Sequence, residues 1–215
     1  MDSPINWSPP SLHRNQCVSR KMDRIFTIGH STHSIDRFID MLDQHGVDTV
    51  GDVRSAPYSR FNPQFSKDAF NRSLRERGKK YVFLGKELGA RSDDPACYKD
   101  GRVQYEVLAK TDLFQSGIQR LKQGLEKGHV IALVCAEKDP LDCHRTLLVS
   151  RELVNQGVKV EHILANGSIE TNDQATERLV RQFKLHQNDL FMSDGDVTQK
   201  ALDKQEERIA YVAGG

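Results

Sequence analysis

The chain has 215 residues, of which 37% are hydrophobic, and its formal net charge is +1. This length can bury one substantial core, and the balanced charge argues against a general nucleic-acid-binding protein. No run approaches the roughly 20 apolar residues of a membrane span, and the N-terminus lacks the apolar centre of a secretory signal. We therefore expect a cytoplasmic protein that does not contact a membrane.

The chain divides into three parts by composition. Residues 1–22 are polar, show no periodicity and are expected to form a disordered leader. Met22, just before the first predicted strand, is a candidate native start. Residues 23–187 are predicted to form a single α/β domain. Residues 188–215 are predicted to form a polar acidic tail with one short helix over Ala201–Ile209.

Five apolar runs predict strands over Arg24–Gly29, Val47–Val53, Lys80–Leu84, His129–Val134 and Val158–Ile163. Helical spacing predicts helices over Ile35–Leu42, Ser66–Arg77, Gln104–Ala109, Leu113–Glu126, Thr146–Gln156 and Thr176–Leu185, with an irregular stretch over Gly85–Arg102. Strands that alternate with helices require crossover connections. We expect an open, mostly parallel five-stranded sheet with helices on both faces, a Rossmann-like arrangement without a dinucleotide fingerprint.

Ligands of such sheets bind at the carboxyl ends of the strands. The residues there that are able to do chemistry are His30, Ser31, Asp52, Arg54, Glu87 and the segment Cys135–Arg145. We predict that one pocket is lined by His30, Asp52, Arg54, Glu137, His144 and Arg145.

The segment Cys135–Arg145 joins an apolar strand to a helix for which Asp142 is the expected N-cap. Cys143 in the first helical turn would then have a lowered pKa and be a candidate nucleophile, or it is a small residue that packs under the helix. Cys135 is expected to be a buried, inert thiol. Arg145 lies at the unfavourable end of the helix dipole, which predicts an acidic partner or a bound anion.

Several side chains near this segment have two interpretations each. Glu137 is a candidate general acid or base, or a structural carboxylate. Lys138 binds phosphate or is a solvated lysine. His30 and His144 transfer protons, or hydrogen-bond the neighbouring backbone. We assign Ser31, Asp52, Arg54, Arg60, Lys138 and Arg145 to anion or substrate binding.

Residues 54–91 contain ten Lys or Arg and three Asp or Glu residues, whereas residues 161–215 contain six and ten. The basic excess is either a solvated helix face or an electrostatic funnel for a phosphate-bearing ligand. Phe61 and Phe65, near Arg60, suit base stacking or core packing equally well.

The four cysteines are irregularly spaced, so we expect reduced thiols. Cys135, Cys143 and His144, with His30, are an alternative soft metal site, although the spacing of the two cysteines matches no common zinc motif.

Four motifs in this order resemble the bacterial and archaeal family called domain of unknown function 488: Thr27-Ile-Gly-His-Ser31, Asp52-Val-Arg54, Leu88-Gly89 and Cys135-Ala-Glu-Lys…Cys143-His144-Arg145. The resemblance covers about Arg24 to Ile163. It implies a prokaryotic protein but no settled activity.

From the residues we expect an enzyme, a possible hydrolase or transferase, that acts on a phosphate-bearing small molecule or a nucleic-acid end. His30, Glu137, Cys143 and His144 are its candidate catalytic residues. The alternative is a non-catalytic ligand or metal sensor that uses the same pocket. The cofactor and the oligomeric state stay open.

Overall fold

The computed structural model describes residues 24–185 and 193–213, so the predicted leader lies outside the described residues. Its main feature is a six-stranded sheet with the strand order β3-β2-β6-β1-β7-β8. The strands are β1 (Arg24–Gly29), β2 (Thr49–Asp52), β3 (Lys80–Phe83), β6 (Ile131–Cys135), β7 (Lys159–Ile163) and β8 (Ile169–Thr171). The first five are parallel, and β8 is antiparallel to β7. The predicted mostly parallel α/β fold is confirmed, with β8 as an additional edge strand.

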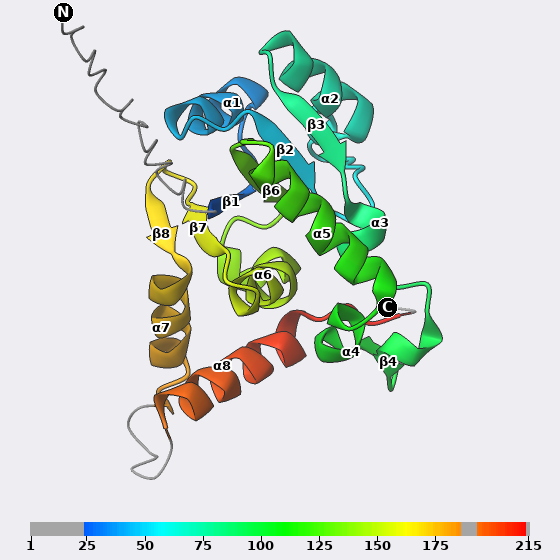
Figure 1. Cartoon of the computed structure of the whole chain (residues 1–215), viewed down its shortest axis with the longest axis vertical. Helices are drawn as coiled ribbons and strands as arrows, with labels where there is room; N and C mark the ends of the chain where they lie inside the picture. The colour runs from blue at the N-terminus through cyan, green and yellow to red at the C-terminus, as the bar shows by residue number, and fades with distance from the viewer. Residues whose placement is uncertain (1–23, 186–192, 214–215) are drawn as a thin grey trace, which may run out of the picture.

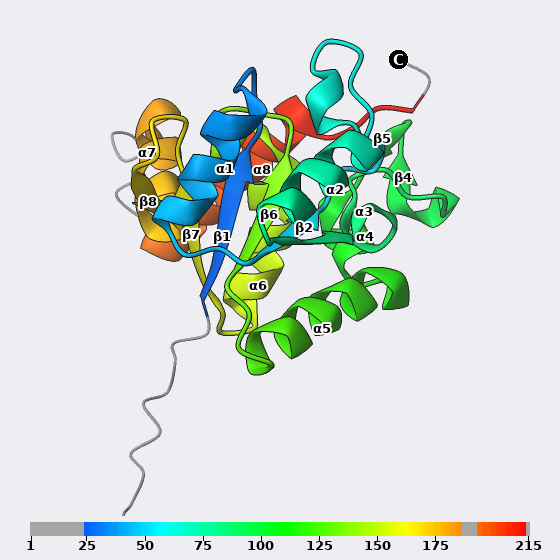
Figure 2. The same cartoon turned by 90° about the horizontal axis from the view of Figure 1, so that it is seen from above.

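Helices cover both faces of the sheet (Figures 1 and 2). The helices are α1 (Ile35–Gln44), α2 (Lys67–Glu76), α3 (Gly85–Leu88), α4 (Tyr105–Ala109), α5 (Asp112–Glu126), α6 (Arg151–Asn155), α7 (Asn172–Gln182) and α8 (Asp194–Ile209). The side of α1 and α2 and the side of α5 and α6 each have their own hydrophobic core.

Strand β6 shows how one apolar run serves both cores. All five of its residues are buried. Ile131, Leu133 and Cys135 belong to the core beneath α5 and α6, whereas Ala132 and Val134 belong to the core beneath α1 and α2. This follows from the two-residue period of a strand, because alternate side chains point to opposite faces.

The predicted irregular stretch Gly85–Arg102 is more ordered than expected. It contains α3, a 3₁₀ turn over Pro95–Cys97 and the first strand of a small hairpin formed by β4 (Tyr98–Lys99) and β5 (Arg102–Val103). These elements are too short to produce a periodic sequence pattern.

Helix α8 is longer than the short helix predicted for the acidic tail. Ser193 caps its start, and the helix continues to Ile209. Val197 and Ala201 are buried with Ala175 and Leu179 of α7. Only a narrow apolar stripe of α8 faces α7. The many charged residues on the rest of the helix weaken the periodic apolar pattern from which its length could have been predicted. Within residues 24–185 and 193–213, no helix is long and apolar enough to cross a membrane.

Candidate active site

The predicted functional residues meet because their strands are neighbours. β2, β6 and β1 lie side by side in the sheet, so the loops at their carboxyl ends lie side by side as well. Between these loops is a pocket of about 600 Å³. The predicted residues that line it are His30, Ser31, Arg54, Cys135, Glu137, Lys138, Cys143 and His144.

Three predicted residues do not line this pocket. Asp52 and Arg145 are buried, with exposed fractions of 0% and 1%. Arg60 is exposed, and its guanidinium carbon lies 5.3 Å from the centre of the Phe61 ring. The prediction that six residues line one pocket is therefore wrong for Asp52 and Arg145, because both side chains are buried and neither reaches the pocket.

Asp52 and Arg54 form a buried ion pair at the end of β2. Nε and Nη2 of Arg54 donate to the two carboxylate oxygens of Asp52 at 2.9 and 2.6 Å, and Nη2 also donates to the Phe65 carbonyl at 2.9 Å. Tyr81 donates its hydroxyl to Asp52 at 2.7 Å. These hydrogen bonds fix the orientation of the Arg54 guanidinium, and the Arg54 side chain also lines the pocket. Tyr81, which comes from β3, was not among the predicted site residues.

Arg145 hydrogen-bonds backbone carbonyl groups rather than an acidic side chain. Its Nη1 donates to the Glu137 carbonyl at 2.7 Å, and its Nη2 faces the Lys138 carbonyl at 3.4 Å. The predicted acidic partner is thus replaced by two carbonyl oxygens of the loop after β6. The Glu137 and Lys138 side chains are exposed.

Gly29 makes this arrangement possible. A Cβ atom at this position would lie 1.8 Å from the Glu137 carbonyl oxygen and 3.3 Å from Nη1 of Arg145. Any side chain would therefore displace the loop that Arg145 holds. Sequence reasoning placed Gly29 at the strand end but did not identify this close approach.

The predicted cap and helix start are wrong. Pro140 begins a separate 3₁₀ turn, Pro140–Asp142, which is capped by Asp139. The following helix begins at His144 and passes into a π-helical segment at Arg145, so Cys143 immediately precedes it. Asp142 instead accepts a hydrogen bond from Gln205 of α8 at 3.1 Å.

Cys135, Cys143 and His144 form a compact cluster. Nδ1 of His144 lies 3.7 Å from the Cys135 sulfur and 3.8 Å from the Cys143 sulfur. Nε2 of His144 lies 3.0 Å from the Val53 carbonyl. The backbone N–H of Arg145 donates to the Cys143 sulfur at 3.4 Å.

The two thiols differ from the prediction. Burial raises the pKa of Cys143, so this residue does not have the lowered pKa expected of a nucleophile. The pKa of Cys135 is lowered instead, because Cys143 donates a hydrogen bond and Arg145 adds a positive charge. Burial and the neighbouring Cys135 sulfur outweigh the stabilisation that the backbone N–H of Arg145 offers the Cys143 sulfur at the helix start. Cys97, Cys135 and Cys143 are free thiols, as expected, and Cys17 lies outside the described residues.

His30 is a neutral ring packed in the pocket wall. It stacks on Phe65 with 4.5 Å between ring centres, and its Nδ1 donates to the Ser31 carbonyl at 2.9 Å. Burial, opposed by this hydrogen bond, and the nearby charge of Arg54 lower its pKa to about 4. At pH 7 the ring is therefore uncharged, and Nε2 is left as a proton acceptor.

One known protein family matches this chain. The family described as domain of unknown function DUF488 matches residues 34–151, more than half of the chain. The chain belongs to the DUF488 family. No curated protein and no solved structure matches it. The span matched to DUF488 contains the loops after β2 and β6, whereas His30 and Ser31 lie before it.

In this DUF488 chain, the loop after β2 holds Phe61 and Phe65, for which base stacking and core packing were the two interpretations, in different environments. Phe65 is fully buried in the core. Phe61 is 84% exposed and Tyr58 is 75% exposed, and both line the pocket. Arg91 also lines the pocket, stacked 4.5 Å from the Tyr211 ring. Tyr58 and Arg91 were not among the predicted site residues.

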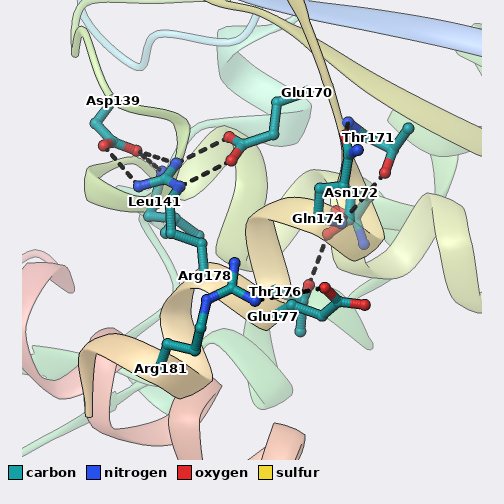
Figure 3. Close-up of polar contacts among 10 residues, drawn as sticks. All are labelled: Asp139, Leu141, Glu170, Thr171, Asn172, Gln174, Thr176, Glu177, Arg178 and Arg181. Atoms are coloured by element: carbon teal, nitrogen blue, oxygen red, sulfur yellow. Dashed lines mark hydrogen bonds and ion pairs between the residues drawn. The ribbon is translucent and has the colours of Figure 1, made fainter. Parts of the chain in front are cut away.

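A second ion network also holds the loop after β6 (Figure 3). Arg178 of α7 donates to both carboxylate oxygens of Asp139 at 2.9 and 3.0 Å, and to both of Glu170 at 2.8 Å. It thereby ties the loop to β8 and α7. In this DUF488 chain, Arg145 and Arg178 thus hold neighbouring residues of the loop after β6. Sequence reasoning missed Arg178 because its partners are 8 and 39 residues away.

Proposed function

We propose that this protein is an enzyme that acts on a phosphorylated or nucleotide-type small molecule in the pocket at the carboxyl edge of the sheet. The observation that carries the proposal is the meeting of three cations, one of them fixed by a buried ion pair, and a neutral histidine in one pocket. The cations are Arg54, Arg91 and Lys138, and the base is His30.

Arg54 is the best placed of these cations for an anion. Its bonds to Asp52 and Phe65 use Nε and Nη2, so Nη1 takes no part in them. A guanidinium held in this way loses little side-chain freedom when it binds phosphate. Lys138 and Arg91 add exposed cations that can adapt to the ligand. Arg145 positions the loop in this scheme and does not contact the ligand.

Proton transfer is assigned to His30. Its Nε2 is the unprotonated nitrogen, because Nδ1 donates to Ser31. Since the ring is neutral at pH 7, its Nε2 is available to accept a proton. Glu137, exposed on the same pocket, is the second candidate for proton transfer.

The exposed aromatic side chains support a nucleotide among the possible phosphorylated ligands. Tyr58 and Phe61 both line the pocket, and their exposed faces suit stacking on a base. The basic excess of residues 54–91 has the sign that attracts a phosphate.

The binding test is calorimetric titration with inorganic phosphate, sugar phosphates and nucleoside monophosphates, at matched ionic strength. Each is compared with its unphosphorylated counterpart, and a 5′-phosphorylated oligonucleotide tests the nucleic-acid end. At a hundredfold excess over the dissociation constant, a bound ligand raises the free energy of unfolding by about 2.7 kcal/mol. Lys138→Ala should weaken binding. Arg24→Ala, at the opposite end of β1, is the control.

Turnover is followed by ³¹P NMR and mass spectrometry with each ligand that binds. His30→Asn should retain phosphate binding and lose turnover, because it removes the base but not the cations. Equal binding of phosphorylated and unphosphorylated ligands would refute the substrate class. Tight binding without turnover would refute the proposal of an enzyme and would favour the alternative of a non-catalytic sensor.

A further inference from the structure

We propose that Cys135, Cys143 and His144 bind one divalent transition-metal ion, with Zn²⁺ the best-matched, and leave its fourth coordination position open to the pocket. This inference goes beyond the proposed function, because it concerns the pocket floor whatever substrate binds above it.

The distances within the cluster already suit a metal ion. A tetrahedral zinc with bonds of about 2.3 Å to sulfur and about 2.05 Å to nitrogen places these ligand atoms about 3.6 Å apart. Nδ1 of His144 lies 3.7 and 3.8 Å from the two sulfurs. All three ligand atoms lie within 4.8 Å of one another. The cluster therefore needs little movement to coordinate an ion.

The histidine is in the tautomer that a metal requires. The Val53 carbonyl, 3.0 Å from Nε2, can only accept, so Nε2 carries the proton. This leaves the lone pair of Nδ1 directed at the two sulfurs. A backbone carbonyl that orients the far nitrogen of a histidine is a common support for metal-binding histidines.

A backbone donor points at one of the two sulfurs. The N–H of Arg145 donates to the Cys143 sulfur at 3.4 Å. Such a bond stabilises negative charge on sulfur, the form in which cysteine binds a metal. Two thiolates balance the charge of a divalent ion.

The ligand types and their number narrow the class of metal. Two thiolates and one imidazole favour zinc and its softer neighbours over magnesium or calcium, which prefer oxygen ligands. Three protein ligands with one open position are typical of catalytic rather than structural zinc sites. Cys135, Cys143 and His144 all line the pocket, so the open position faces a water molecule or a substrate oxygen.

The Cys-x₇-Cys-His spacing is longer than in common zinc motifs because the loop between the ligands contains a 3₁₀ turn. Cys135 ends β6, and Cys143 and His144 follow the 3₁₀ turn Pro140–Asp142. Arg145 and Arg178 hold neighbouring residues of the connecting loop. Residues of this loop therefore need not follow a zinc-finger spacing.

The test is titration of the reduced, chelator-treated full chain with Co²⁺. We expect one equivalent to produce the visible bands of tetrahedral cobalt and a sulfur-to-cobalt charge-transfer band, both removed by added Zn²⁺. Cys143→Ser and His144→Ala should each weaken Zn²⁺ binding by more than about 100-fold, the upper end of the cost of losing an outer hydrogen-bond partner. Cys97→Ser, which removes a buried thiol outside the cluster, should bind as the parent does.

Absence of the charge-transfer band in the folded parent protein would overturn the proposal, and this result does not depend on whether any variant folds. One-equivalent binding that survives in both Cys143→Ser and His144→Ala would overturn it as well. Lys138→Ala should leave the cobalt spectrum unchanged. Failure of the metal site and failure of phosphate binding are therefore distinguishable.

Discussion

His162 should make the protein less stable in mild acid. The residue lies in β7 and is fully buried, with Nδ1 2.8 Å from the hydroxyl oxygen of Thr27 on β1. Burial and the positive charge of Arg145 lower its pKa from 6.5 to about 3. The folded protein thus keeps this ring neutral at pH values where the unfolded chain binds a proton.

The size of the effect follows from the two pKa values. Between pH 6.5 and pH 3, the unfolded state holds one more proton at His162 than the folded state. The free energy of unfolding therefore falls as the pH falls, by about 1.4 kcal/mol per pH unit. The contribution is complete above pH 6.5, and about 2 kcal/mol of it is lost between pH 7 and pH 5.

The assay is urea unfolding of the parent and His162→Asn at pH 7 and pH 5. Asparagine does not titrate, and its amide can still reach the Thr27 hydroxyl. We expect the variant to lose about 2 kcal/mol less than the parent between these pH values. Ile163→Ala, a buried neighbour in β7, should lower stability equally at both. The same pH dependence in His162→Asn and the parent would refute the argument.

Two further predictions concern the loop after β6. Gly29→Ala should lower the free energy of unfolding by about 1–3 kcal/mol in urea denaturation, because its Cβ atom would lie 1.8 Å from the Glu137 carbonyl. Gly195→Ala, where the nearest atom is 3.8 Å from the added Cβ, should not; equal losses would contradict the steric argument. Arg178→Ala should cost about 1–3 kcal/mol at pH 7, because two carboxylates lose their shared partner. Arg181→Ala, which breaks an exposed pair with Glu177, should cost at most about 0.5 kcal/mol, and a similar loss in both would show that the network adds no stability.

The sequence determined the sheet and the edge at which the candidate site forms. Continuous apolar runs such as Ile131–Cys135 mark strands buried on both faces, and the helices between them require parallel connections. Those two facts place His30, Arg54 and the loop after β6 at one edge of the sheet. The same patterns did not reveal β8 or the length of α8, because short strands and narrow apolar stripes give weak periodicity.

Only the tertiary structure decided what each side chain at that edge does. Arg145 contacts carbonyl oxygens instead of an acid, and Gly29 leaves room for the loop that it holds. The pKa order of Cys135 and Cys143 reversed because burial and a neighbouring sulfur outweigh the dipole of the helix that begins directly after Cys143. Such effects depend on distances of a few ångströms between residues far apart in the chain. Periodicity and spacing along a sequence carry no record of those distances, so the sequence locates the site while the packing assigns its chemistry.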